Sequence, residues 1–157
     1  QKKNKNGSIF AKMNSLEDPK IIEKLYEASS VGVKIRLLVR GICCLVPGVS
    51  GLSENIEVRS VVGRFLEHSR IYMFNNNSNA RVFMASADWM QRNFDRRIEL
   101  MFEIYKQDIK EQLNSILETY WKDNTKARIL SPEKTYAYYK NGEDRFNAQE
   151  FFINHYA

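Results

Sequence analysis

The chain has 157 residues, of which 43% are hydrophobic and 27% are charged, so its composition fits one folded domain and excludes a disordered tail. No run approaches the roughly 18 apolar residues of a membrane-spanning helix. The net charge of +5 favours an anionic partner, which by charge alone includes nucleic acid, a nucleotide, polyphosphate or a membrane surface.

The start of the chain shows a strand–helix–strand pattern. Residues 7–16 are expected to form a strand that runs into a turn. A helix is expected over 17–33, with Asp18 as its cap and Pro19 at its first position. Residues 34–41 are a short apolar run, typical of a buried strand. The short links between these elements predict a parallel α/β unit.

The middle of the chain alternates turn-forming and apolar segments. A loop is expected over 43–55 because of its Pro, Gly and Ser residues, and a hairpin turn over 75–80 because of its asparagines. A helix is predicted over 106–124, with Asp108 and Glu111 near capping-box spacing. Strands are predicted at 56–63, 69–74, 81–87 and 97–105.

The last part of the chain, 126–157, is polar and aromatic with only weak periodicity. We therefore expect one mixed α/β domain over 1–125, followed by a C-terminal extension over 126–157. The two cysteines, Cys43 and Cys44, are adjacent, and a disulfide between neighbours would be strained. Two reduced thiols predict a cytoplasmic protein.

Arg40 stands at the predicted carboxyl end of the strand over 34–41 and is followed by Gly41 and a loop. Ligands of parallel α/β sheets bind outside such strand ends, and an arginine there can contact phosphate oxygens through two N–H groups. The alternative is a strand-end arginine held by a structural carboxylate. Position alone does not choose between the two.

His68 is one of two histidines in the chain, and it lies in an otherwise apolar run, two residues before Arg70. A histidine, then a cation at the second position, then a strand is a pattern that can form one half of a phosphate-handling site. The structural alternative is a histidine satisfied by a backbone carbonyl. The segment 84–99 then carries more polar side chains than a turn requires: Ser86, Asp88, Arg92, Asn93, Asp95, Arg96 and Arg97.

Three segments together carry a specific resemblance: VRGICCL over 39–45, RFLEHSRIY over 64–72 and SADWMQRNFDRRIE over 86–99. With the residues around them, over about residues 1–125, they resemble the C-terminal catalytic domain of bacterial polyphosphate kinases of the histidine-phosphorylating, long-chain type. The resemblance implies a phospholipase D-like mixed sheet flanked by helices, within a larger enzyme. The tail after residue 125 carries none of these motifs.

The resemblance implies an enzyme that reversibly transfers the terminal phosphate of ATP to polyphosphate, with Mg²⁺ and through a phosphohistidine. The histidine that accepts the phosphate and most Mg²⁺ ligands are expected upstream, in other domains of the same polypeptide. This fragment alone is expected to be inactive. The full enzyme is expected to be a homo-oligomer, cytoplasmic or at the membrane periphery, with no transmembrane segment and no need for nucleic acid.

Within this chain, Arg40 and Arg97 match arginines that bind the nucleotide phosphates in the family, and His68 matches a second essential histidine assigned to ATP binding. The resemblance thus implies that His68 is catalytic, either as an acid or base or as a phosphate ligand. Three further residues have either supporting or purely structural roles: Arg70, Ser86 and Asp88.

Two other functions remain compatible with the sequence. A phospholipase D-like nuclease or phosphodiesterase would need two copies of the chain to complete its site, and Arg70 in place of the usual lysine argues against it. A non-catalytic module would bind polyphosphate or nucleic acid by charge, with a steep dependence on salt.

Overall fold

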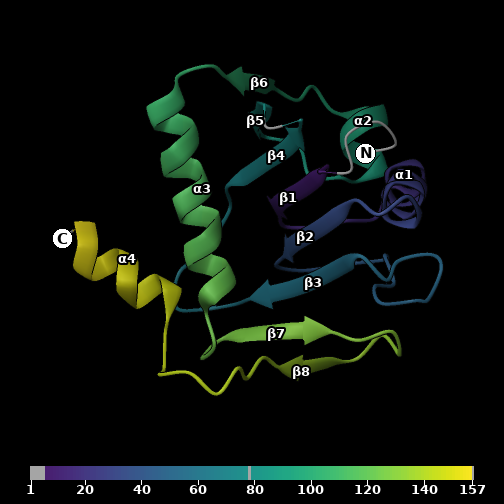
Figure 1. The fold of residues 1–157 in the computed structure, drawn as a ribbon. Helices are drawn as coiled ribbons and strands as arrows, with labels where there is room; N and C mark the ends of the chain where they lie inside the picture. Colours follow the sequence, from purple (N-terminus) through teal and green to yellow (C-terminus); the bar gives the residue numbers. More distant parts are fainter. Residues whose placement is uncertain (1–5, 78, 157) are drawn as a thin grey trace.

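A mixed sheet forms the centre of the computed structural model, which describes residues 6–77 and 79–156 (Figure 1). Its strands lie in the order β6-β5-β4-β1-β2-β3-β7-β8, with β1, β2 and β3 parallel and the other neighbours antiparallel. The predicted α/β fold class and the parallel unit at the start of the chain are confirmed. The elements are β1 (Ser8–Met13), α1 (Pro19–Ser30), β2 (Lys34–Val39), β3 (Ile56–Val61), β4 (Arg70–Asn76), β5 (Asn79–Ala85), α2 (Gln91–Arg96), β6 (Met101–Ile104), α3 (Gln107–Lys122), β7 (Ala127–Leu130), β8 (Tyr136–Tyr138) and α4 (Ala148–Tyr156).

The two faces of the sheet bury separate hydrophobic cores, because successive side chains of a strand point to opposite faces. Helix α1 covers one core, and α3 covers the other with α4 beside its C-terminal end (Figure 1). Neighbouring residues of one strand therefore belong to different cores: Ala11 and Leu37 to the core under α1, and Phe10 and Leu38 to the core under α3.

Helix α1 begins as predicted. The Asp18 carboxylate accepts a hydrogen bond from the backbone N–H of Ile21 at 2.8 Å, and Pro19 occupies the first helical position. Gly32, which follows the helix, has a φ of 89°, a conformation that favours glycine. This helix carries the chain from β1 back to the start of β2, so the two strands run parallel.

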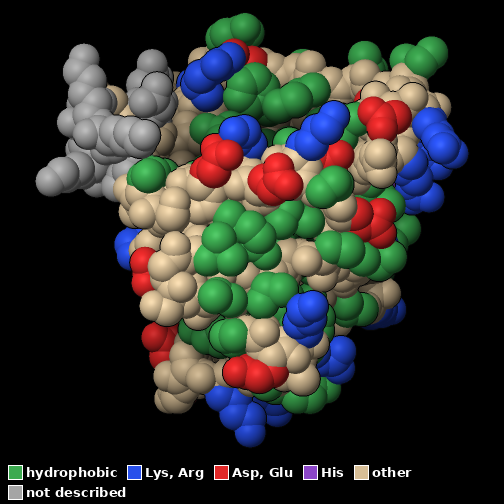
Figure 2. All heavy atoms as spheres, turned by 90° about the vertical axis from the view of Figure 1, so that its right-hand side faces the viewer, with side chains coloured by type: hydrophobic (Ala, Val, Ile, Leu, Met, Phe, Trp, Pro, Cys, Tyr) green, Lys and Arg blue, Asp and Glu red, His purple; other side chains and the backbone are tan. Residues whose placement is uncertain are grey.

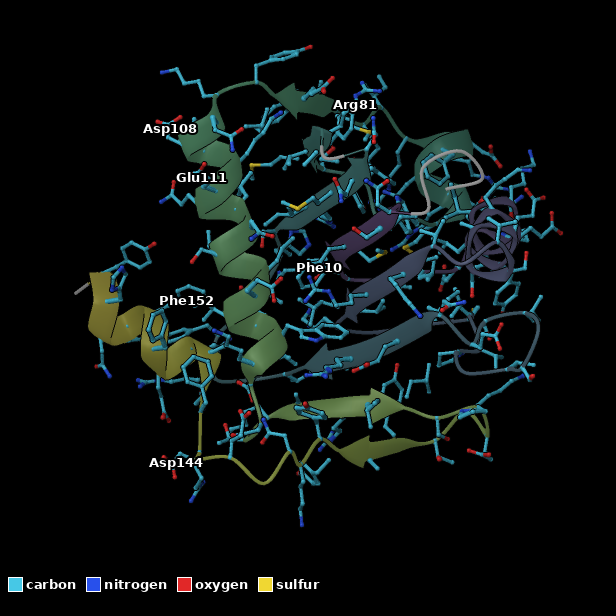
Figure 3. All side chains as sticks on the ribbon, in the orientation of Figure 1. Phe10, Arg81, Asp108, Glu111, Asp144 and Phe152 are labelled. Carbon is cyan, nitrogen blue, oxygen red and sulfur yellow. The ribbon has the colours of Figure 1, made fainter. Side chains whose placement is uncertain are left out.

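Helix α3 is confirmed, but its predicted cap is wrong. The N-cap residue is Lys106, whose side chain makes no capping hydrogen bond. Glu111 instead accepts a hydrogen bond at 2.9 Å from the side chain of Gln107, and Figure 3 shows Asp108 and Glu111 directed away from the sheet. Neither α3 nor any other helix within the described ranges has the length and apolar character needed to cross a membrane.

The strand predicted over 97–105 is correct only at its end, where β6 spans Met101–Ile104. Ile98 and Leu100, which gave the segment its strand-like pattern, are exposed, and the preceding helix α2 was not predicted. The hairpin between β4 and β5 is confirmed, with pairing that continues to Asn76 and Asn79, so its turn is shorter than 75–80. Residue 78 lies outside the described residues.

The segment 126–157 contributes β7 and β8 to the sheet and α4 to the face that α3 covers. The buried carboxylate of Asp123 accepts hydrogen bonds from the backbone N–H groups of Lys126 at 2.6 Å, Ala127 at 3.1 Å and Ala148 at 2.9 Å. One side chain thus fixes the starts of β7 and α4 to the end of α3. The domain boundary at residue 125 stays a prediction, and β7 pairs directly with β3.

Replacing Asp123 with alanine is expected to lower the free energy of unfolding by about 3 kcal/mol, because charge-assisted hydrogen bonds are lost and their N–H donors stay buried. Urea denaturation followed by circular dichroism measures this change. Asp144→Ala is the matched control, since Asp144 is exposed in the loop before α4 (Figure 3). Equal stability of the two variants would contradict the assignment.

Candidate active site

One edge of the sheet collects the predicted site residues. β1, β2 and β3 end at this edge, and the antiparallel β4 begins there. Arg40 directly follows β2, as predicted, while His68 lies just before β4 and Arg70 opens it. β5 ends there too, and Asp88 follows it. Figure 2 views the molecule from the side of α1, where acidic and basic side chains are mixed and no histidine is visible.

Asp88 is a buried carboxylate with several donors around it. It accepts hydrogen bonds from the backbone N–H of Asn14 at 2.7 Å and from two guanidinium nitrogens of Arg70 at 3.1 and 2.9 Å. Burial raises the pKa of this carboxyl group, but the hydrogen bonds from Arg70 and Asn14 outweigh burial and hold the pKa below its ordinary value. Asp88 therefore stays ionised and fixes the position of the Arg70 guanidinium group.

Arg70 in turn contacts both the ring and the backbone of His68. One guanidinium nitrogen lies 3.0 Å from His68 Nδ1 and donates to the His68 carbonyl oxygen at 2.9 Å. A guanidinium group can only donate, so a His68 ring nitrogen that bonds to it is the acceptor. The second guanidinium nitrogen lies farther away, 3.4 Å from Nε2. Arg70 therefore orients the His68 ring, and His68 is exposed to solvent.

Asn14 joins Arg40 to the same cluster, although the sequence analysis did not identify it. Its side-chain oxygen accepts a hydrogen bond from Arg40 Nε at 3.0 Å, while its backbone N–H donates to Asp88. The sequence could have indicated Asn14, because this residue directly follows β1 as Arg40 follows β2. Arg40 therefore has an amide partner, and no hydrogen bond from its guanidinium to a carboxylate is found among the described residues.

Ser86 and Arg97 lie around a different carboxylate, that of Glu99. The Ser86 hydroxyl and the Asn93 amide both donate to Glu99, and these bonds hold its pKa below the ordinary value, with smaller contributions from Arg97 and Arg70. Ser86 also accepts a hydrogen bond from the backbone N–H of Leu100 at 3.0 Å. The structure thus gives Ser86 contacts within the segment 86–100 and places Arg97, which is exposed, near Glu99.

Lys12 is a buried cation that the sequence analysis missed. Its ammonium donates to the carbonyl oxygen of Ser69 at 3.2 Å and to the Ser69 hydroxyl at 2.9 Å, and it lies 3.9 Å from a carboxylate oxygen of Glu67. Burial lowers the pKa of Lys12 to about 8; Glu67 raises it, and the nearby Arg40 and Arg70 lower it. A lysine within the apolar strand SIFAKM was the available sequence signal.

This edge suits a phosphate group better than a cation. Arg40 and Arg70 supply fixed positive charge with N–H donors, and His68 adds a ring nitrogen. In the described residues, no group of three or more His, Cys, Asp and Glu side chains is arranged to hold a metal ion. The described residues therefore supply no three-ligand metal site at this edge.

Two solved structures share the fold of this chain. A phospholipase D family member, Nuc from Salmonella typhimurium, matches with a TM-score of 0.60 and 15% identity over 79% of this chain and 82% of its own. The polyphosphate kinase from Porphyromonas gingivalis matches with a TM-score of 0.93 and 41% identity over 98% of this chain and 24% of its own. The phospholipase D-like fold implied by the sequence resemblance is thereby confirmed.

The family follows from the sequence comparisons. The family model described as polyphosphate kinase C-terminal domain 2 matches residues 1–149. The polyphosphate kinase of Lactiplantibacillus plantarum is 56% identical over 129 residues, which are 82% of this chain and 18% of that protein. That of Staphylococcus saprophyticus is 48% identical over 152 residues, 97% of this chain and 21% of that protein. This chain belongs to the polyphosphate kinase C-terminal domain 2 family, and it spans about a fifth of the length of these relatives.

The side chain of Lys12 is expected to titrate with a midpoint of about 8 in ¹³C NMR, against an ordinary pKa of 10.5. Because the Glu67 carboxylate raises this pKa, Glu67→Gln is expected to lower the midpoint further. Glu143→Gln, at an exposed position, is the matched control and is expected to leave the midpoint unchanged.

The lowered pKa of Lys12 also sets the direction of a stability change. Between about pH 8 and pH 10.5 the unfolded chain binds the proton that folded Lys12 has lost, so this group makes folding more favourable as the pH rises through that window. In the NMR titration, a Lys12 midpoint in Glu67→Gln that is equal to or above that of the unmodified chain would contradict the contact between Lys12 and Glu67.

Proposed function

We propose that this chain forms part of the active site of a polyphosphate kinase, which reversibly transfers the terminal phosphate of ATP to polyphosphate. Membership of the family supports the reaction class. The observation that carries the proposal is the cluster of Arg40, His68 and Arg70 at one sheet edge, held by the buried Asp88 and by Asn14. Such fixed donors fit a reaction in which charge on phosphoryl oxygens must be stabilised.

The residues of this chain act on the transferred phosphate by position and charge. Arg40, with Arg97 as a further cation, binds the phosphate oxygens of the nucleotide without any change of protonation. His68, with its ring oriented by Arg70, donates a hydrogen bond from a ring N–H to a phosphate oxygen. The bond between the terminal phosphorus and its bridging oxygen breaks, ADP leaves, and a bond from phosphorus to an acceptor histidine outside this chain forms. In the second step a terminal oxygen of polyphosphate bonds to the phosphorus, the bond from phosphorus to the histidine nitrogen breaks, and the histidine is regenerated.

The rest of the reaction is assigned to parts of the enzyme outside this sequence. We place the phosphate-accepting histidine and most Mg²⁺ ligands in upstream domains, as the family resemblance implies, and this chain spans about a fifth of the length of its relatives. The whole enzyme is proposed to work in the cytoplasm, where ATP is available, and to be a homo-oligomer. On this assignment the chain alone binds ATP or polyphosphate but does not transfer phosphate.

Changing His68 or Arg40 to alanine in the whole enzyme is expected to reduce ATP-dependent polyphosphate synthesis by at least about 100-fold, because each removes a donor to the reacting phosphate. Synthesis is measured with γ-labelled ATP, together with acid-labile protein phosphate. Arg81→Ala is the matched control, since Arg81 is an exposed arginine paired with Glu103 on a distant part of the sheet (Figure 3). Near-normal synthesis by both site variants would overturn the proposal.

Tripolyphosphate binding to the isolated chain separates a phosphate site from general attraction by charge. Arg40→Ala is expected to weaken binding about tenfold at physiological salt, because a charge-assisted contact is lost. Arg81→Ala removes the same charge elsewhere and is expected to have little effect. Equal, strongly salt-dependent losses in both variants, measured by calorimetry, would favour a module that binds polyanions by charge alone.

A further inference from the structure

The segment that carries His68 has no regular secondary structure of its own. Residues 62–69 connect β3 to β4, and Phe65 and Leu66 within it are exposed at 49% and 69%. Such a loop lacks the backbone pairing that holds a strand, so its conformation depends on contacts from elsewhere. Arg70 orients the His68 ring, but it does not hold the loop on the amino-terminal side of His68.

Gln149 in the first turn of α4 supplies those contacts. Its side chain is buried, and its amide oxygen accepts a hydrogen bond from the backbone N–H of Phe65 at 3.0 Å. Its amide nitrogen donates to the Phe65 carbonyl oxygen at 2.9 Å and to a carboxylate oxygen of Glu67 at 3.0 Å. One side chain therefore satisfies both backbone groups of Phe65, as a neighbouring strand would, and holds the residue before His68.

Two further observations show how the loop is held on both sides of His68. A Cβ atom at Gly63 would lie 2.7 Å from the Gln149 side-chain carbon Cδ, so only glycine allows the close approach. On the other side of His68, the Lys12 ammonium holds both the carbonyl and the hydroxyl of Ser69. The residues before and after His68 are thus fixed from separate elements, α4 and β1.

We propose that Gln149 is a positioning residue for His68, and that α4 is thereby part of the active-site architecture. The inference rests on the function proposed above for His68. Gln149 does not touch the reacting phosphate. It fixes the loop so that His68 meets Arg70 and the substrate in one geometry, and small misplacements of a catalytic group cost large factors in rate. The C-terminal segment 126–157 thereby gains a role in catalysis.

The test uses the full-length kinase that contains this chain, with Gln149→Ala and Gly63→Ala, which disturb the same contact from its two sides. Asn154→Ala is the matched control, because it removes an exposed amide from the same helix. In both Gln149→Ala and Gly63→Ala, hydrogen exchange of a peptide covering 62–69, measured by mass spectrometry, is expected to be at least about tenfold faster. Two or more hydrogen bonds to this loop are lost in each variant. A peptide from α1 reports whether the fold is intact.

The kinetic readout separates positioning from a purely structural role. In Gln149→Ala and Gly63→Ala, kcat is expected to fall at least about tenfold while the KM for ATP changes much less, and Asn154→Ala is expected to match the unmodified enzyme. Unchanged exchange over 62–69, or faster exchange with unchanged kcat while His68→Ala is inactive, would overturn the inference and leave the proposed function standing. Full activity of His68→Ala would instead remove the function on which the inference rests.

Discussion

The buried carboxylate of Asp88 is the interaction on which the candidate site depends. It gathers donors from β4 and from the end of β1, so the positions of Arg70 and Asn14 are set by one charge. Through these two residues it also determines where His68 and Arg40 lie. The cations at this edge repel one another, and an ionised, fully bonded carboxylate offsets part of that repulsion inside the protein. On the function proposed above, the remaining positive charge attracts an incoming phosphate group.

The fold was predictable where apolar residues follow a clear pattern or where residues typical of a helix start are present. The strand–helix–strand start was correct because Asp18 and Pro19 mark the helix and apolar runs mark the strands. Helix α2 and the late start of β6 were missed, because Ile98 and Leu100 are apolar yet exposed and so imitate a buried strand. The capping prediction at Asp108 and Glu111 failed since spacing alone does not show whether a side chain reaches the backbone.

The site was predictable in part for a related reason. Arg40, His68, Arg70 and Asp88 stand next to strand ends, where ligand-binding residues of such sheets gather, and the structure brings them into one connected cluster. Partners from remote parts of the chain were not foreseeable from local patterns. Asn14 and Asp88 are 74 positions apart, and Phe65 and Gln149 are 84 positions apart. Lys12 was overlooked because residues 7–16 were predicted only as a strand that runs into a turn, without asking which way each side chain points.

The bond between Gln149 and the loop at Phe65 has a consequence for the biosynthesis of the protein. A ribosome releases the strands around His68 well before it reaches residue 149, because those 84 positions are translated one after another. During that interval the nascent chain can already pair β1, β2 and β4, while the segment 62–69 still lacks the amide that holds it. The candidate site is therefore completed late, after its supporting sheet, and an incompletely translated chain carries His68 without the Gln149 contacts that hold its loop.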